Sequence, residues 1–236
     1  MAIKWLHSYL RVSSTDSRLL KEARAASQLQ HPHIVTVYDV VEANGQIFLV
    51  MEYLEGQTLV ELLRKEKRLP LAQVIILVEQ AAAALDYAHA QGIIHRDIKP
   101  ANLMIIPTNI LKLTDFGIAK IAGDPQTTHG SEFKGTVIYM SPEQTNQQPL
   151  DGRSDLFSLA TVTFEMLSGA SPWPGQGVLE LMTQIATAPP LPLAPFAGSN
   201  AAELDVIFQK ALAKDPAERF QRGADFVQAL KQVTAG

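Results

Sequence analysis

Three side chains whose oxygen atoms can bind a metal ion or accept a proton lie close together in the middle of the chain. Asp97 and Asn102 belong to the stretch HRDIKPANLM, and Asp115 belongs to LTDFGIAK. Phosphoryl transfer to a hydroxyl needs one carboxylate that orients the hydroxyl and accepts its proton, and further oxygen ligands that hold Mg²⁺ against the phosphates. The sequence therefore offers the groups for phosphoryl transfer, with a polar turn capped by Asp and Asn side chains as the structural alternative.

A third stretch, GTVIYMSPEQ, follows these two in the sequence. Together the three resemble the motif set of protein kinases, specifically of the bacterial serine/threonine kinases of eukaryotic type. The resemblance extends from Ala2 to about residue 233. It implies an α+β, bilobal, protein-kinase-like fold, with a truncated small β lobe at residues 1–53 and a mainly helical large lobe at residues 54–236.

The resemblance assigns a role to each polar residue of the catalytic stretch. Asp97 is expected to be the catalytic base, and Lys99 a cation beside the transferred γ-phosphate. Asn102 and Asp115 are the expected metal ligands. Lys99 also favours Ser/Thr acceptors, because tyrosine kinases usually lack a lysine at this place. The implied activity is phosphorylation of Ser/Thr hydroxyls on protein substrates, with ATP and Mg²⁺ or Mn²⁺.

The resemblance also predicts an ATP site in the first half of the chain. Lys4 in AIK is expected to contact the α- and β-phosphates and to pair with Glu22 in KEAR. Met51 matches the gatekeeper before the hinge, although packing in the core explains it equally well. Glu52 to Leu54 are expected to offer backbone groups to adenine, and Met104 to form the floor of the adenine pocket. The residues expected around the nucleotide are thus Ala2, Lys4, Glu22, Met51, Glu52, Leu54 and Met104.

Residues 115–143 resemble an activation segment, which ends here in Ser-Pro-Glu where many relatives have Ala-Pro-Glu. Arg96 typically pairs with a phosphate on such a segment. Val137 stands where a proline is common, so the peptide preference is expected to differ. The candidate autophosphorylation sites, which are otherwise ordinary loop hydroxyls, are Thr127, Thr128 and Ser131, and the substrate-docking loop is expected to start at Gly135 and Thr136.

Four further residues are expected to have structural roles. His95 resembles the motif histidine that packs beneath the catalytic loop, and Asp155 resembles the residue that anchors the backbone of this loop. Arg219 in KDPAERF is expected to form an ion pair with Glu143.

The composition excludes several other classes of protein. The chain has 236 residues, of which 47% are hydrophobic, and a net charge of −4 without a long basic run, so no nucleic-acid partner is expected. It has no cysteine, which excludes disulfides, thiolate metal sites and a cysteine nucleophile. His31 and His33 alone are a weak zinc pattern, because a third ligand is missing.

The longest apolar stretch, LPLAQVIILVEQAAAALDYAHA, contains Glu79, Gln80 and Asp86 and predicts a buried helix. The first residues lack the order of a signal peptide. The chain is therefore expected to be cytoplasmic, without a membrane segment. Besides ATP and protein substrates, the resemblance implies a homodimer for autophosphorylation.

Residue patterns predict the elements that must position these groups. A strand is expected at residues 2–6, a helix at 15–30, and a hairpin around Asn44-Gly45, whose residues tolerate the positive φ of a tight turn. Further helices are expected near 57–66, 71–91, 154–168, 177–187, 202–213 and 223–233, and short strands at 103–106 and 110–114.

In kinases, two strands and a Gly-rich loop precede the strand that carries the lysine, and the sequence has no such loop before Lys4. Three hypotheses follow: Met1 is an internal start of a longer gene, the chain is truncated and nearly inactive, or it is a kinase-like scaffold. A non-catalytic binding module is thus the alternative function. A kinase for small molecules such as aminoglycosides or choline is disfavoured, because GTVIYMSPEQ resembles a peptide-docking platform.

Overall fold

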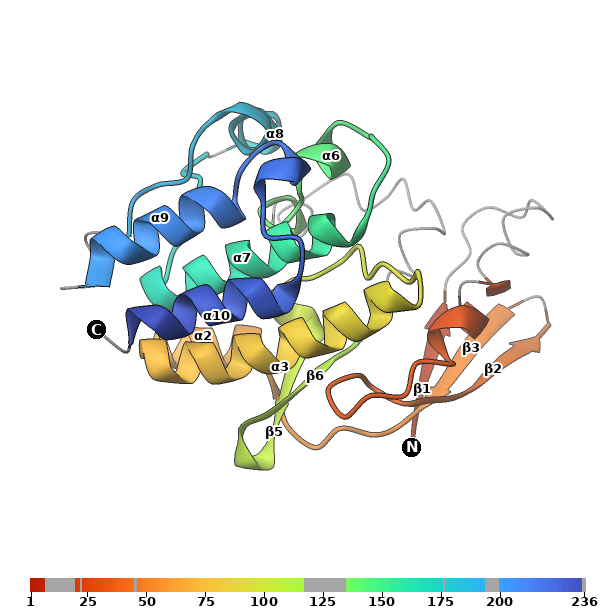
Figure 1. The fold of residues 1–236 in the computed structure, drawn as a ribbon. Helices are drawn as coiled ribbons and strands as arrows, with labels where there is room; N and C mark the ends of the chain where they lie inside the picture. Colours follow the sequence, from red (N-terminus) through yellow and green to blue (C-terminus); the bar gives the residue numbers. More distant parts are fainter. Residues whose placement is uncertain are drawn as a thin grey trace.

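The structure, a computed structural model, describes residues 1–6, 20–21, 23–44, 46–116, 135–175, 177–193 and 200–234. Figure 1 shows a small sheet beside a larger part built mainly of helices, which agrees with the α+β class predicted from the sequence. The strands are β1 (Ala2–Leu6), β2 (Val37–Ala43), β3 (Gln46–Met51), β4 (Gln57–Thr58), β5 (Leu103–Ile106) and β6 (Ile110–Leu113). The helices are α2 (Leu59–Glu66), α3 (Leu71–Ala90), α6 (Pro142–Thr145), α7 (Gly152–Ser168), α8 (Val178–Thr187), α9 (Ala201–Ala211) and α10 (Gly223–Val233).

The first sheet has the strand order β1-β3-β2, and both neighbouring pairs are antiparallel. The predicted strand at residues 2–6 and the predicted hairpin are therefore confirmed. Asn44, between β2 and β3, has a φ of 52°, which is the left-handed conformation that a tight hairpin turn requires. Lys4 lies opposite Leu49 in the pairing of β1 with β3, so a neighbouring strand fixes the position of its backbone.

The helix predicted at residues 15–30 lies only partly within the described residues. Residues 20, 21 and 23–26 are helical, and residues 27 and 28 form a turn. The Ser27 hydroxyl donates to the carbonyl of Arg24 at 2.8 Å. The helix thus ends at residue 26 rather than 30, and beyond it the backbone bonds tighten to an i→i−3 pattern, with Gln28 N donating to Ala25 O and Leu29 N to Ala26 O.

The second sheet has the order β4-β5-β6, and β4 was not predicted. Residues 57 and 58 were expected to begin a helix, but Thr58 precedes α2 as its N-cap. Its hydroxyl accepts from Glu61 N at 3.2 Å, and its own N–H donates to the Glu61 carboxylate at 2.7 Å. This reciprocal capping box starts the helix at Leu59 and leaves Gln57 and Thr58 extended, so that they pair with β5.

Backbone hydrogen bonds connect the segment before β2 with β6 of the second sheet. Val35 N donates to Leu113 O, and Leu113 N donates to His33 O, both at 2.9 Å. Ile34 and Leu113 therefore form an isolated parallel bridge. A side-chain link lies close by, because Lys112 Nζ is 2.6 Å from the Glu52 carboxylate. The two sheets are thus joined through β6.

Helix α7 lies at the centre of the helical part and is buried on almost every side, as its apolar residues predict. It begins at Gly152 rather than at residue 154, because the Asp151 side chain accepts from Arg153 N at 2.9 Å and caps the helix. Several hydroxyl groups on α7 are buried, and each donates to the carbonyl four residues earlier at 2.7 to 3.1 Å. These residues are Ser158, Thr161, Thr163 and Ser168.

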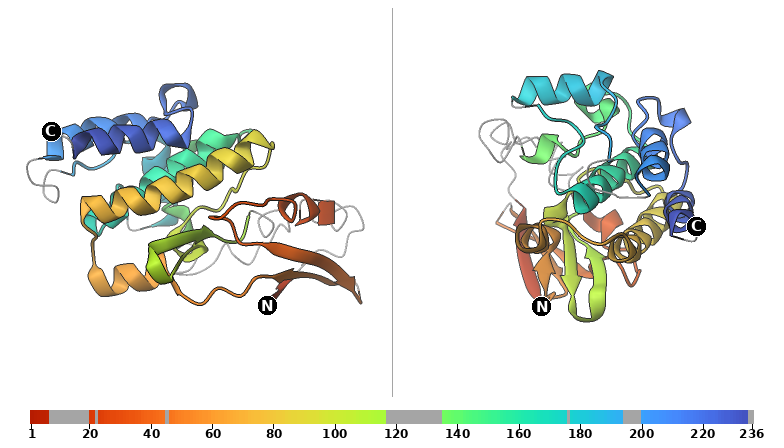
Figure 2. Two further views of the ribbon diagram at one scale, coloured as in Figure 1. Left: turned by 60° about the horizontal axis from the view of Figure 1, so that its bottom comes forward. Right: turned by 90° about the vertical axis from the view of Figure 1, so that its left-hand side faces the viewer.

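Helix α3 packs against both α7 and α10 (Figures 1 and 2). Nine of its residues are buried, in agreement with the buried helix predicted for this stretch. Within the described part of the chain, it is the one helix that is long and apolar enough to cross a membrane, and half of that apolar window is buried inside the structure.

The N-terminus of α10 is capped from α3 rather than by its own flanking residue. Asp86 on α3 accepts from Gly223 N at 2.7 Å and from Ala224 N at 3.0 Å. Gly223 is required at this crossing, because a Cβ atom there would lie 2.8 Å from the Cβ of Ala82. The close approach of the two helices brings the carboxylate within reach of the two N–H groups.

We expect Asp86→Ala to lower the free energy of unfolding by about 1–2 kcal/mol, because two N–H groups at the start of α10 lose their acceptor. Glu79→Ala is the matched control: it removes a carboxylate of the same helix whose ion pair with Lys231 on α10 is 48% and 52% exposed. The control is expected to lose less than about 1 kcal/mol. Urea unfolding measures both losses, and equal losses would contradict the role of Asp86 as a cap.

Candidate active site

Asp97 is held on two sides within its own loop. Lys99 Nζ is 2.9 Å from Asp97 Oδ2, and Asn102 Nδ2 donates to the same oxygen at 2.9 Å and to the Asp97 carbonyl at 2.8 Å. A single 3₁₀ turn at Pro100–Asn102 folds the chain back, with Asn102 N donating to Lys99 O at 2.9 Å. Pro100 favours this turn because its φ is already fixed. The turn therefore places the cation and the amide on the same carboxylate.

Asp115 follows β6, whose pairing with β5 brings it beside the Asp97 loop. Leu103 pairs with Leu113, so the residues that flank them, Asn102 and Thr114, are neighbours. Thr114 donates to Asn102 O through its N–H at 3.0 Å and its hydroxyl at 3.2 Å. Asp115 has a φ of 62°, and its carboxylate is 2.6 Å from Lys4 Nζ of β1. The lysine and the aspartate predicted to act on ATP thus lie together.

His95 is fully buried beneath the loop. Its Nε2 is 2.9 Å from the Thr114 carbonyl, its Nδ1 is 3.3 Å from Asp97 N, and its ring lies 4.5 Å from that of Phe116. Burial lowers the pKa of His95 below 6.5, against the opposing effect of Asp155 and other carboxylates, so the ring is neutral at pH 7. The neutral ring donates from Nε2 and accepts at Nδ1, which matches both contacts.

Asp155 on α7 binds the backbone just before Asp97. Its Oδ1 accepts from Arg96 N and its Oδ2 from His95 N, both at 2.7 Å. His89 Nε2 on α3 lies 2.8 Å from the same Oδ2. Arg96 has a φ of 67°, an unfavourable conformation for a residue with a side chain, and the two anchored N–H groups help to hold it. The anchoring expected of Asp155 is present, but His89 was missed from sequence.

Glu143 and Arg219 form a buried bidentate ion pair. Arg219 Nη1 and Nη2 donate to the two Glu143 oxygens at 2.7 and 2.8 Å, and Ser154 Oγ donates to Oε1 at 2.6 Å. The guanidinium also lies 4.8 Å from the ring centre of Phe157. Burial by itself raises the pKa of Glu143, but the hydrogen bonds from Arg219 and Ser154 outweigh it, so the pKa lies below 4.5. The expected pairing fixes α6 to α7.

Tyr139 and Glu165 form a partly buried contact, in which the phenol donates to the carboxylate at 2.7 Å. Burial raises the pKa of both groups. Tyr139 N also donates to Thr136 O, and residues 135–137 form a helical turn, so the expected docking loop rests on α7. Val137, which occupies the place of a proline, is fully buried.

The residues expected around adenine lie where β3 ends and in the second sheet. Met51 pairs with Ala2 of β1, and Met104 pairs with Thr58. Glu52 has contacts that the sequence did not predict: its N–H donates to Thr36 O at 2.9 Å, and its carboxylate accepts from Thr36 N at 2.7 Å. The backbone group of Glu52 that can face a base is therefore its carbonyl, not its N–H.

Some of the predicted site residues lie outside the described residues. They are Glu22, Thr127, Thr128 and Ser131.

The His31 and His33 side chains bind neighbouring groups of the protein. His31 stacks on Tyr87 with ring centres 5.1 Å apart, and His33 Nδ1 is 2.9 Å from Leu111 O. In the part of the chain that the structure describes, no three His, Asp or Glu side chains are grouped to hold a metal ion.

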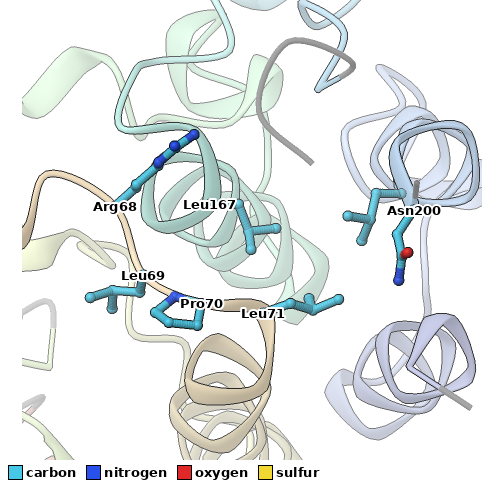
Figure 3. A pocket seen from close by; sticks show the side chains of 7 residues that line it. Arg68, Leu69, Pro70, Leu71, Leu167 and Asn200 are labelled. Carbon is cyan, nitrogen blue, oxygen red and sulfur yellow. The ribbon is translucent and has the colours of Figure 1, made fainter. Parts of the chain in front are cut away.

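A cavity of about 440 Å³ lies at the other end of the helical part, between the start of α3, the end of α7 and the start of α9 (Figure 3). Its lining shares no residue with the cluster around Asp97. The lining residues are Arg68, Leu69, Pro70, Leu71, Leu167, Asn200 and Leu204.

Comparison with known proteins identifies a family and several relatives. The sequence matches the family described as protein kinase domain over residues 1–232. Serine/threonine-protein kinase PknB of Mycobacterium leprae is 39% identical over 242 residues, which cover 100% of this chain and 39% of that protein. PknB of Mycobacterium tuberculosis is 38% identical with the same coverage, and PknA of the same species is 39% identical over 93% of this chain and 51% of its own length. The chain spans about two fifths of the length of the PknB relatives.

We expect Glu143→Gln to lower the free energy of unfolding by about 3 kcal/mol at pH 7, because Arg219 stays buried without its counter-charge. The pKa of Glu143 is lowered in the folded chain, so its stabilisation is complete above the ordinary glutamate pKa and is lost as the pH falls through the lowered value. The difference between wild type and variant should therefore shrink on acidification. Urea unfolding between pH 7 and pH 3 measures it.

Glu165→Gln is the control, because the pKa of Glu165 is shifted in the opposite direction to that of Glu143. Because burial raises the pKa of Glu165, the folded state holds its proton more tightly than the unfolded state does. Acidification should therefore stabilise the wild type relative to this variant. The same pH trend in both variants would contradict the assignment of the two carboxyl groups.

Proposed function

The chain belongs to the protein kinase family, and from this premise we propose that it transfers the γ-phosphoryl group of ATP to Ser/Thr hydroxyls of protein substrates. The observation that carries the proposal is the Asp97 carboxylate, which Lys99 and Asn102 hold at 2.9 Å each. The Asp115 carboxylate is 2.6 Å from Lys4 Nζ. Its neighbour Thr114 donates its N–H to the Asn102 carbonyl, which joins Asp115 to the loop of Asp97. The base and the ligands that phosphoryl transfer needs are thus parts of one hydrogen-bonded unit.

In this proposal Asp97 orients the acceptor hydroxyl and takes its proton. The contact with Lys99 suits this step, because the cation stabilises the carboxylate and lies where charge develops on the transferred phosphoryl group. The amide of Asn102 prevents rotation of the carboxylate by holding Oδ2. Such fixed orientation is a main part of the catalytic power in phosphoryl transfer.

Asp115 and Asn102 are the residues that would hold Mg²⁺ or Mn²⁺. The donor set fits, because Mg²⁺ is usually bound by one or two protein oxygens together with phosphates and water. Asn102 directs its amide nitrogen to Asp97, which leaves the amide oxygen for a cation. When bound, the metal ion neutralises the negative charge on the phosphates.

Lys4 is proposed to bind the α- and β-phosphates. Its side chain is 38% exposed and its ammonium group is 2.6 Å from the Asp115 carboxylate, so it would reach a phosphate bound beside that carboxylate. Pairing of Lys4 with Glu22, adenine contacts near Met51, Glu52, Leu54 and Met104, and regulation through phosphorylation of the activation segment belong to the same proposal. So do the division into lobes at residue 53, a cytoplasmic location and a homodimer for autophosphorylation.

We expect Asp97→Asn to lower the rate of phosphotransfer to a Ser/Thr peptide by about 10²- to 10⁴-fold, because the amide cannot accept the proton. The variant should still bind ATP, since the Lys4–Asp115 pair is unchanged. Initial rates with radiolabelled ATP measure the loss. Asp225→Asn, the same change on an exposed residue of α10, is the control and should leave the rate unchanged. Equal rates for Asp97→Asn and wild type would refute the proposed role.

We expect ATP to raise the melting temperature of the chain only when Mg²⁺ or Mn²⁺ is present, because a ligand that binds the folded state stabilises it. Removal of the metal with EDTA should abolish the shift, and Asp115→Asn should reduce it strongly by removing a metal-binding charge. Differential scanning fluorimetry measures both effects. No shift in the wild type under any condition would favour the alternative, a non-catalytic binding module.

A further inference from the structure

The backbone of Arg96 needs support at both its N–H and its carbonyl. Its φ of 67° costs about 1–3 kcal/mol in a residue with a side chain, so it persists only where the surroundings hold it. Arg96 directly precedes Asp97, and any relaxation of its backbone rotates the carboxylate that follows. Asp155 holds the N–H of Arg96 at 2.7 Å, as described above. The carbonyl of Arg96 has a different partner.

That partner is Gln144 on α6, whose Nε2 donates to Arg96 O at 2.8 Å. The same side chain closes the N-terminus of its own helix: Oε1 accepts from Ser141 N at 3.0 Å, and Gln144 N donates to Ser141 Oγ at 3.3 Å. One amide therefore caps α6 and binds the catalytic loop at the same time.

The chemistry of these two contacts selects glutamine. Either glutamate or glutamine can accept from the N-cap N–H in a capping box. A carbonyl such as Arg96 O needs a donor, however, and a carboxylate has none, whereas the amide donates and accepts at once. With a glutamate at this position, two oxygen atoms would face each other where Nε2 and Arg96 O now lie 2.8 Å apart.

Gln144 projects from an element that cannot easily move. Its neighbour Glu143 forms the buried pair with Arg219 and accepts from Ser154 of α7. Ser141, the N-cap, is completely buried. The position of the Gln144 amide is therefore set by α7 and by the end of the 135–141 segment.

We propose that Gln144 is a positioning residue that couples the 135–141 segment to Asp97, by fixing the carbonyl of the strained Arg96. This inference rests on the proposed phosphoryl transfer, in which the segment docks the peptide substrate and Asp97 accepts the proton. Order in the docking segment is thereby transmitted to the catalytic carboxylate through one side-chain amide.

The kinetic test compares Gln144→Glu with Gln148→Glu, which makes the same chemical change on an exposed side chain just beyond α6. Gln144→Glu is expected to lower kcat about tenfold or more, because a small displacement of a reacting group has a large effect on rate. The KM for ATP should change less than about twofold, since the ATP residues are not touched. A variant that loses kcat and ATP affinity together would show general damage and would overturn the proposal.

A second measurement does not depend on activity. Hydrogen–deuterium exchange of the peptide that contains His95, Arg96 and Asp97 should be faster in Gln144→Glu than in Gln148→Glu, because the loop opens more often. Faster exchange in a chain without any phosphotransfer would refute the proposed function and leave the positioning role intact. Unchanged exchange and unchanged kcat would overturn the positioning role. Gln144→Met, which removes both hydrogen bonds without adding charge, replaces Gln144→Glu in these measurements if that variant does not fold.

Discussion

The carboxylate of Asp155 is the interaction on which the rest of the site depends. It is buried on the central helix and accepts from two successive backbone N–H groups of the catalytic loop. The loop has little regular structure of its own, and Arg96 adopts a conformation that is unfavourable without external support. Asp97 therefore derives its position from the packing of α7. The chemistry of the loop depends on the stability of the helical core.

Strand β6 has a comparable role for the nucleotide end of the site. It pairs with β5 on one side and with the backbone around Ile34 on the other, and Asp115 lies two residues beyond its end. The segment around Ile34 leads into β2, which belongs to the sheet that contains Lys4. Lys4 and Asp115 are far apart in the sequence, yet this route brings them to 2.6 Å. Backbone hydrogen bonds between the two sheets thus bring the two charged side chains together.

The sequence was most informative where function requires particular residue types at particular spacing. Asp97 and Asn102 are five positions apart, and a single turn at Pro100 is enough to join them. Long helices followed from their apolar patterns. His89 and Asp86 could not be predicted in this way, because their partners lie on other helices and depend on how these cross. Only one of the two roles of Gln144 can be predicted from the sequence. The Ser141-x-x-Gln144 spacing indicates a capping box, but it does not indicate the contact with Arg96.

The hydroxyl groups of α7 have a consequence for how freely the surrounding sequence can vary. Thr161 and Thr163 donate to carbonyls of the helix itself, whereas Ser158 also donates to the Tyr139 carbonyl at 2.6 Å and Ser168 also bonds Ala170 just beyond the helix. Around Thr161 and Thr163, neighbouring helices therefore need to supply only apolar surface of suitable shape, and many combinations of side chains do so. Ser154, Asp155, Ser158 and Glu165, by contrast, each bind a specific polar partner outside the helix. Substitutions can accumulate around this part of the helix over evolutionary time, while its contacts with the loop stay constant.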